Sequence, residues 1–140
     1  MFTHARVLLI SNDEMEASAL EGILSEHVVL IRVRDFSEMQ TALGKGSYDA
    51  LFCGWSFHRG TWNDALKQVQ RRCPDLPVII YSRAGGAREW LEVIEAGAFD
   101  LLTAPYLKRH VLPVLEHAVV SHEARRLHNN TASYASEMTN

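Results

Sequence analysis

The chain has 140 residues, 47% of them hydrophobic and 22% charged, with a formal net charge of −3. These values indicate one soluble globular domain with its own core, and the small negative charge argues against direct nucleic-acid binding, which favours a basic chain. Apolar runs such as residues 7–10 are too short to span a membrane, and the first residues lack the pattern of a signal peptide. We therefore expect a cytoplasmic protein that contacts neither nucleic acid nor membrane directly.

Short apolar segments alternate with longer amphipathic segments along the chain. Residues 7–10 form a continuous apolar run, which is typical of a parallel strand buried on both faces. Thr61 and Asp64 have the spacing of a capping box, Ser37 is the expected N-cap of the second helix, and Gly97 is placed to end a helix. In chain order, the expected elements are strand 7–10, helix 14–26, strand 28–33, helix 37–43, strand 50–53, helix 61–72, strand 77–81, helix 87–96, strand 99–103 and a last helix within 107–128.

The last helical segment contains Pro113, and a helix tolerates proline well only in its first turn. The regular helix is therefore expected to begin late, near His110, or to be kinked. Residues 129–140 are small and polar, a composition typical of disorder. We expect a domain of residues 1–128 followed by a disordered tail of residues 129–140.

Five strands that alternate with five helices predict an α/β fold. The expected architecture is a doubly wound, five-stranded parallel sheet flanked by five helices, of the flavodoxin-like type. Such sheets bind ligands at the carboxyl ends of their strands, near the switch in strand order. The segments that follow these ends are residues 11–13, 54–56, 82–83 and 103–105, and they are the candidate site.

A helix end, a glycine turn, a short strand and a proline follow one another between Glu95 and Tyr106. This segment resembles the corresponding segment of response-regulator receiver domains, the CheY-like signalling fold, and the resemblance extends over residues 5–120. It implies a module of two-component, or phosphorelay, signal transduction. In that family an acidic pair after the first strand holds magnesium, and an aspartate at the end of the third strand is phosphorylated.

The resemblance places the receiver's acidic positions on residues without charge. The acidic pair that holds magnesium corresponds to Ser11 and Asn12, with Asp13 one place further along. The phosphorylated aspartate corresponds to Gly54, which has no side chain, and Asp49 lies roughly 16 Å away at the start of the same strand. Because magnesium needs oxygen ligands that also supply charge, the magnesium site is expected to be lost.

The remaining receiver positions follow the fourth strand or lie in and after the fifth. Ser82 matches the hydroxyl residue that bonds the phosphoryl group, whereas Ala104 replaces the lysine and Leu101 stands at the position of the switch aromatic. The bond between Ala104 and Pro105 resembles the family's cis bond. Without nucleophile, metal cage and cation, aspartyl phosphorylation by the usual route is not expected. The resemblance implies a degenerate receiver, or pseudo-receiver, with no catalytic residues and no enzyme activity.

The sequence favours structural rather than catalytic or metal-binding roles for the thiol of Cys53 and for the histidines of the last helical segment. Cys53 lies inside an apolar strand, as expected for a buried thiol without reactivity. The histidines of the last helical segment lack the i, i+3 or i+4 spacing of helical metal ligands, so they are expected to be solvated rather than to hold a metal. These are His110, His117, His122 and His128.

A candidate contact surface lies on the fourth helix. Trp90 and Val93 are one turn apart and are assigned to its outward face, with Leu91 and Ile94 directed to the core. An exposed tryptophan–aliphatic pair is typical of a protein interface. We therefore expect Trp90 and Val93 to bind a partner.

The segment after the third strand contains further aromatic and basic residues. Trp55 and Trp62 are expected to cover the place of the lost phosphorylation pocket. His58 and Arg59 have the chemistry to bind an anion or a carboxylate, although an ordinary exposed loop is favoured.

Four hypotheses follow. The leading one is a signalling module that acts through protein–protein contacts without phosphate, with a histidine kinase, an output domain or a second copy of the chain as partner. The second is a phosphorelay receiver with an altered acceptor, namely Ser56, Ser82 or Asp13. The third is a small-ligand sensor that uses the vacated pocket. The fourth, an unrelated enzyme on the same fold, lacks a glycine-rich phosphate loop and a nucleophile–base pair.

Overall fold

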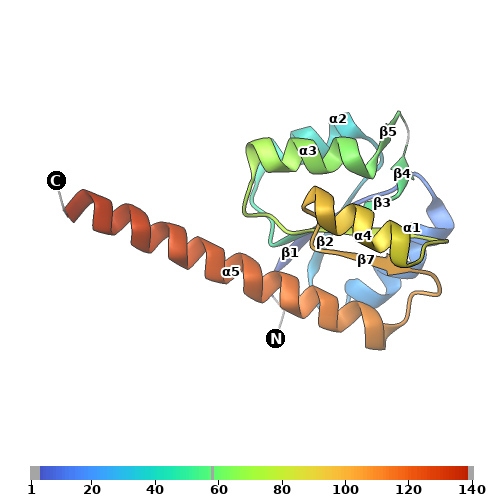
Figure 1. Cartoon of the computed structure of the whole chain (residues 1–140). Coiled ribbons are helices and arrows are strands. Elements are labelled where there is room, and N and C mark those ends of the chain that lie inside the picture. The colour runs from blue at the N-terminus through green and yellow to red at the C-terminus, as the bar shows by residue number, and fades with distance from the viewer. Residues whose placement is uncertain (1–3, 58, 139–140) are drawn as a thin grey trace.

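One sheet of five parallel strands forms the centre of the molecule (Figure 1). The computed structural model describes residues 4–57 and 59–138, with side chains described up to residue 128. The strand order is β2-β1-β3-β6-β7, so the direction of winding switches between β1 and β3. The carboxyl ends of β1 and β3 therefore flank the crevice in which this architecture places ligands. The strands are β1 (Arg6–Ile10), β2 (Val29–Val33), β3 (Ala50–Gly54), β6 (Val78–Ser82) and β7 (Asp100–Thr103).

Two layers of helices cover the sheet. Helices α1 and α5 pack on one face, and α2, α3 and α4 pack on the other (Figure 1). Every residue of β3 and β6 is buried, as expected for central strands covered on both faces. The predicted doubly wound α/β fold is confirmed. The helices are α1 (Glu14–Leu24), α2 (Phe36–Lys45), α3 (Trp62–Arg72), α4 (Ala87–Ala96) and α5 (Lys108–Met138).

Acidic side chains cap two of the helices on the α2–α4 face. The carboxylate of Asp35 accepts a hydrogen bond of 2.9 Å from the N–H of Glu38, so Asp35 and not Ser37 is the N-cap of α2. The extended backbone of Asp35 allows this bond, whereas Ser37 already lies in the first turn. At α3 the N–H of Thr61 donates to the carboxylate of Asp64 at 3.1 Å, which confirms the predicted capping pair.

A short hairpin between β3 and α3 is not predicted by the sequence. It pairs β4 (Ser56–Phe57) with β5 (Gly60–Thr61) in antiparallel fashion. The ring of Phe57 is buried, and a Cβ atom at Gly60 would lie 2.5 Å from it. Close approach of backbone and ring therefore requires glycine at this position. His58, which the sequence pairs with the next arginine, lies outside the described residues.

Helix α5 differs from its expected boundaries at both ends. It begins at Lys108, where the N–H of Val111 donates to the carbonyl of Leu107 at 2.9 Å, and it includes Pro113 in its second turn. It continues to Met138 and extends beyond the sheet (Figure 1). Residues 129–138 continue this helix, and the expected disorder of residues 129–140 stays a prediction. The domain boundary at residue 128 stays a prediction.

No helix within the described ranges, residues 4–57 and 59–138, is both long enough and apolar enough to cross a membrane.

The glycine that ends α4 gives a testable stability difference. Gly97 has φ of 109°, and a Cβ there would lie 2.5 Å from Nε2 of Gln70, which donates to the carbonyl of Ala96. We expect Gly97→Ala to lower the free energy of unfolding by about 1–2 kcal/mol. Gly22→Ala is the matched control, because a Cβ there meets no atom within 4 Å; it should raise stability by about 0.5–1 kcal/mol. Urea denaturation measures both, and equal effects would contradict the assignment.

Candidate functional site

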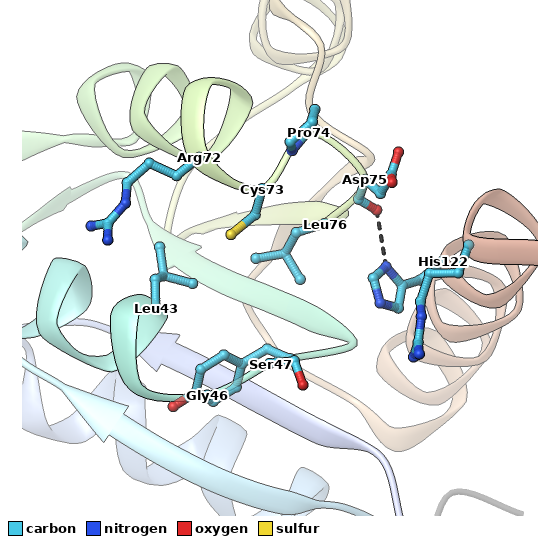
Figure 2. Close-up of a pocket in the computed structure, with 11 residues that line it drawn as sticks. Leu43, Gly46, Ser47, Arg72, Cys73, Pro74, Asp75, Leu76 and His122 are labelled. Atoms are coloured by element: carbon cyan, nitrogen blue, oxygen red, sulfur yellow. Dashed lines mark hydrogen bonds between the residues drawn. The ribbon is translucent and has the colours of Figure 1, made fainter. Parts of the chain in front are cut away.

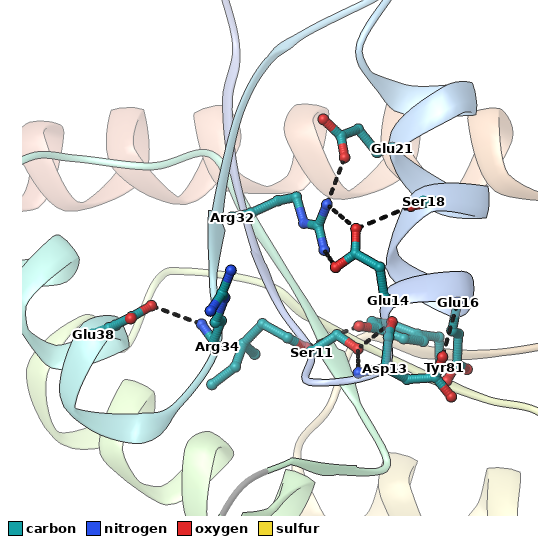
Figure 3. A network of polar contacts seen from close by, with 11 residues as sticks. Ser11, Asp13, Glu14, Glu16, Ser18, Glu21, Arg32, Arg34, Glu38 and Tyr81 are labelled. Atoms are coloured by element: carbon teal, nitrogen blue, oxygen red, sulfur yellow. Dashed lines mark hydrogen bonds and ion pairs between the residues drawn. The ribbon is translucent and has the colours of Figure 1, made fainter.

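Asp13, which lies in the loop after β1, is the one carboxylate among the candidate-site residues, and it already takes part in two structural contacts. The carboxylate of Asp13 accepts from the N–H of Glu16 at 3.1 Å and so caps α1. It also forms an ion pair with Arg83, which joins the loop after β1 to the loop after β6. The hydroxyl of Ser11 accepts from the N–H of Asp13 at 3.1 Å, and Asn12 is exposed (Figure 3). The side chain of Asp13 thus serves as a cap and as an ion-pair partner.

A tyrosine that the sequence analysis does not single out fills the space beside Gly54. Tyr81 on β6 is paired with Gly54 in the sheet register, and its side chain is fully buried. A Cβ atom at Gly54 would lie 3.4 Å from both Cζ and the hydroxyl oxygen of Tyr81. The hydroxyl donates to the carbonyl of Ile10 at 2.9 Å (Figure 3). The phenol ring therefore lies in contact with the place where a side chain at position 54, the acceptor position that the resemblance implies, would begin.

A second tyrosine closes the same region from the α5 side. The ring of Tyr106 packs edge-on against Tyr81, with 6.0 Å between the ring centroids. Its hydroxyl donates to the carboxylate of Glu16 on α1. Tyr106 follows the peptide bond between Ala104 and Pro105, which is cis as the sequence predicts. The position of the family's lysine is therefore an exposed alanine beside two packed aromatic rings.

The hydroxyl of Ser82, the one family residue type that the sequence keeps, is engaged in a local turn. It donates to the carbonyl of Ala84 at 2.7 Å and accepts from the N–H of the same residue at 3.3 Å. Ser82 is also buried. Its side chain stabilises the loop between β6 and α4, which ends at Gly86, the N-cap of α4.

The donor set of this crevice does not fit a magnesium ion. Magnesium is usually bound through one or two carboxylates together with neutral oxygens and water, and none of Ser11, Asn12 and Gly54 supplies a carboxylate. Among residues 4–57 and 59–138 no three histidine, cysteine, aspartate or glutamate side chains are grouped in a way that would hold a metal. Asp13 alone does not replace an acidic cluster, since Arg83 already balances its charge.

Trp55 and Trp62 do not fill the space beside Gly54. Their ring centroids lie 5.6 Å apart, and both pack with the core between the sheet and helices α2 to α4. Tyr81 belongs to the core on the opposite face, toward which the alternation of β3 directs position 54. The prediction that these tryptophans cover the lost pocket is wrong, because the pocket and the tryptophans lie on different faces of the sheet.

The outward face of α4 differs from the predicted one. Val93 is fully buried in the core, whereas Leu91 is 50% exposed and Trp90 is 45% exposed. A separation of two residues turns a helix by about 200°, so burial of Val93 places Leu91 on the far side. The indole N–H of Trp90 donates to the carboxylate of Asp100 at 3.0 Å. Val93 is therefore excluded from the exposed pair, and Leu91 takes its place.

Burial distinguishes one thiol and one histidine from the other thiol and histidines. Cys53 is fully buried, and this burial raises the pKa of its thiol. His122 is buried against the loop before β6, with Nδ1 3.0 Å from the carbonyl oxygen of Asp75, so the prediction that it is solvated is wrong. The other three histidines of the segment, His110, His117 and His128, are exposed.

A charged network holds α1 beside β2. Arg32 on β2 lies 3.0 Å from the carboxylate of Glu14 and 2.9 Å from that of Glu21 (Figure 3). The hydrogen bond from Arg32 lowers the pKa of the Glu14 carboxyl. This network positions the helix whose N-cap is Asp13 and whose first turn carries Glu16.

Comparison with known proteins identifies the fold. No protein-family model and no curated protein matches the chain. The signal receiver domain of an HD domain-containing protein from Pseudomonas fluorescens matches with a TM-score of 0.80 and 17% identity, over 90% of this chain and 94% of that one. NtrX from Brucella abortus in complex with ADP matches with a TM-score of 0.84 and 20% identity, over 92% of this chain and 30% of that one. The beryllofluoride-activated NtrC4 receiver domain dimer gives a TM-score of 0.76 at 20% identity, over 84% and 98%.

These matches define the class of the molecule by its architecture. The chain has the CheY-like fold of response-regulator receiver domains along nearly its whole length. At identities of 17% to 20%, these matches show the fold alone. The chemistry of the site has to be inferred from the residues of this chain.

The buried tyrosines predict a loss of stability in alkali. Burial raises the pKa of Tyr81, so in the folded state its hydroxyl stays protonated when the phenol of the unfolded chain ionises near pH 10. Its contribution is therefore complete below about pH 10 and is lost as the pH rises further, with a slope of about 1.4 kcal/mol per pH unit. Tyr81→Phe should make this decline shallower, while costing about 1–2 kcal/mol at pH 7 through the lost hydrogen bond to Ile10.

Urea denaturation of the parent protein and Tyr81→Phe between pH 7 and pH 11 measures this effect. Tyr106→Phe is the comparison variant, because partial burial also raises the pKa of Tyr106. An alkaline decline in Tyr81→Phe as steep as that of the parent would contradict the prediction.

Proposed function

We propose that this chain is a signalling module of the two-component class that acts through protein–protein contacts and without phosphorylation. The observation that carries the proposal is the ring of Tyr81 beside Gly54, with its hydroxyl bonded to the carbonyl of Ile10. A filled, hydrogen-bonded site without an acceptor supports a fold kept for its surface rather than for phosphoryl transfer. The proposal includes loss of the magnesium site, absence of enzyme activity and a cytoplasmic location.

The structure weakens the alternatives to different degrees. For a receiver with an altered acceptor, the hydroxyl of Ser82 is buried in a turn and Asp13 is paired with Arg83, so exposed Ser56 is the most accessible candidate. For a sensor that uses the vacated pocket, the ring of Tyr81 takes the space that a ligand would need. Both alternatives therefore receive less support than a phosphate-independent module.

Intact mass spectrometry after incubation with acetyl phosphate and magnesium tests the absence of phosphorylation. We expect no gain of a phosphoryl group and no change of tryptophan fluorescence on magnesium titration, because the site lacks nucleophile and metal ligands. A receiver domain with an intact acidic site, treated in parallel, is the positive control. A gain of one phosphoryl group would overturn the proposal, and mapping would then decide between Ser56, Ser82 and Asp13.

The exposed apolar face of α4 supports a contact surface. Trp90 and Leu91 are about half exposed, and the hydrogen bond to Asp100 fixes the indole of Trp90 beside β7. Large exposed side chains of this kind are typical anchors at interfaces. We propose that this surface binds a protein partner: a histidine kinase, an output domain or a second copy of the chain. The NtrC4 receiver domain, which forms a dimer, provides a precedent for the last option.

Three substitutions on α4 separate contact from stability. Trp90→Ala and Leu91→Ala should weaken self-association or partner binding and leave the fold intact, whereas Val93→Ala should cost about 2 kcal/mol of stability, because Val93 is fully buried. Met15→Ala is the matched control, since Met15 is 81% exposed on α1. Analytical ultracentrifugation and urea denaturation provide the two readouts. Unchanged association in both Trp90→Ala and Leu91→Ala would remove this face from consideration.

A further inference from the structure

Two large apolar side chains are exposed along one line of α5. Val120 is 58% exposed and Leu127 is 67% exposed. His117 and Ala124, both exposed, lie between and before them, so the four residues follow one another at alternating steps of three and four. This is the heptad spacing by which one helix packs along another. We call His117, Val120, Ala124 and Leu127 the α5 seam.

The seam faces away from the domain to which α5 belongs. Val111, Leu115 and His122 are buried on the opposite side of the helix. There Nδ1 of His122 lies 3.0 Å from the carbonyl oxygen of Asp75, which holds α5 against the loop before β6 (Figure 2). At about 100° per residue, Val120 lies about 180° around the helix from Val111. The seam is therefore directed toward solvent and not toward its own sheet.

The sequence continues the same spacing beyond the sheet. Thr131, Tyr134 and Met138 stand at the next three positions of the pattern, and the backbone is helical up to Met138 (Figure 1). The pattern from residue 117 to residue 138 spans about three heptads, the length at which it favours a coiled coil. This end is rich in asparagine, threonine and serine, and a lone helix of such residues is marginal in water. A paired helix would supply the stabilisation that this composition lacks.

The residues beside the seam favour a second copy of the same helix in parallel orientation. Glu123 and His128 flank the seam on opposite sides, at positions g and e of the heptad, and both are exposed. In a parallel pair, Glu123 of one copy lies opposite His128 of the other, whose ring N–H can donate to the carboxylate. In an antiparallel pair, the g positions of the two copies, Glu116 and Glu123, would face each other with like charge.

From this arrangement we infer that the α5 seam binds the α5 seam of a second copy of the chain, as a parallel two-stranded coiled coil. Val120 and Leu127 of both copies form the apolar core of the pair. Glu123 and His128 pair along its edges. Each domain lies on the outer side of its own helix, because the buried side of α5 is opposite to the seam. Helix α4 packs on the other face of the sheet, so its exposed surface stays available to a different protein.

Sedimentation equilibrium of the parent protein, Val120→Ala and Leu127→Ala tests the association. We expect the parent to dimerise with a Kd on the order of 10 μM, and each substitution to raise the Kd at least about tenfold by removing apolar contact area in both copies. Alanine is the best helix former, so the loss would not come from a weaker helix. Met15→Ala is the matched control, since Met15 is 81% exposed on α1, and it should leave the Kd unchanged.

Two results of this experiment would overturn the inference. One is a parent protein that stays monomeric up to about 1 mM, the weakest range in which pairing would be meaningful. The other is an unchanged Kd in both Val120→Ala and Leu127→Ala.

Oxidative cross-linking tests the orientation. Val120→Cys and Leu127→Cys, each combined with Cys73→Ser because Cys73 is partly exposed, should both give disulfide-linked dimers. In a parallel pair every seam residue lies opposite its own copy, whereas in an antiparallel pair only one of the two positions could do so. Arg125→Cys, exposed on α5 outside the seam, is the control and should give no linked dimer. Cross-linking at one seam position only, or equally at Arg125→Cys, would contradict parallel pairing.

The inference goes beyond the proposed function and does not rest on it. Neither measurement detects phosphorylation, and a chain that is phosphorylated could still pair through α5. The two contact surfaces are also distinguishable, because Trp90 and Leu91 belong to α4. Self-association that is weakened by Trp90→Ala and Leu91→Ala but not by Val120→Ala and Leu127→Ala would assign the second copy to α4 and overturn the inference.

Discussion

The packing of Tyr81 against Gly54 is the constraint on which the carboxyl end of the sheet depends. A buried phenol hydroxyl needs an acceptor, because leaving it unbonded in an apolar environment costs free energy. The carbonyl of Ile10 provides that acceptor at 2.9 Å, and the bond links the ends of β1 and β6 over β3. A Cβ atom at position 54 would lie in van der Waals contact with this ring, at 3.4 Å, so a longer side chain there would compete with the ring for space. Glycine and tyrosine thus form one packing unit at the carboxyl ends of β3 and β6.

Polar groups around this unit are satisfied locally rather than directed into an open site. Asp13 caps α1 and pairs with Arg83, and the hydroxyl of Ser82 is bonded within its own turn. By contrast, at the amino end of the sheet Arg72 and Arg126 line a cavity and have no carboxylate partner within the residues that the structure describes. The two ends of the sheet therefore differ in kind: one is a closed part of the core, and the other presents charge beside a cavity.

The alternation of strands and helices and the lack of acidic residues at positions 11, 12 and 54 can be read directly from the sequence. Apolar runs, the capping pair at Thr61 and the helix end at Gly97 depend on neighbouring residues, so they can be predicted from the sequence. The role of Tyr81 cannot be predicted in this way. It depends on which residue of β3 lies opposite Tyr81 and on the face of the sheet toward which the ring points. The sequence pattern of α4 predicts the wrong outward face for a related reason: Leu91 and Val93 are both apolar, and the packing of the helix on β7 decides which one is buried. Sheet register, applied to Gly54 and Tyr81, is the signal that would have found the filled site.

The length of α5 gives the contact between His122 and the loop before β6 a mechanical significance. His122 and Arg126 lie near the middle of a helix of 31 residues that continues to Met138. From His122 to the far end, a rise of about 1.5 Å per residue gives a lever arm of about 24 Å. A tilt of about 10° at His122 would displace the far end by about 4 Å, which is comparable to the spacing between neighbouring strands. A change too small to disturb the packing around Val111 and Leu115 would thus be amplified along the helix into a displacement that a neighbouring molecule can detect.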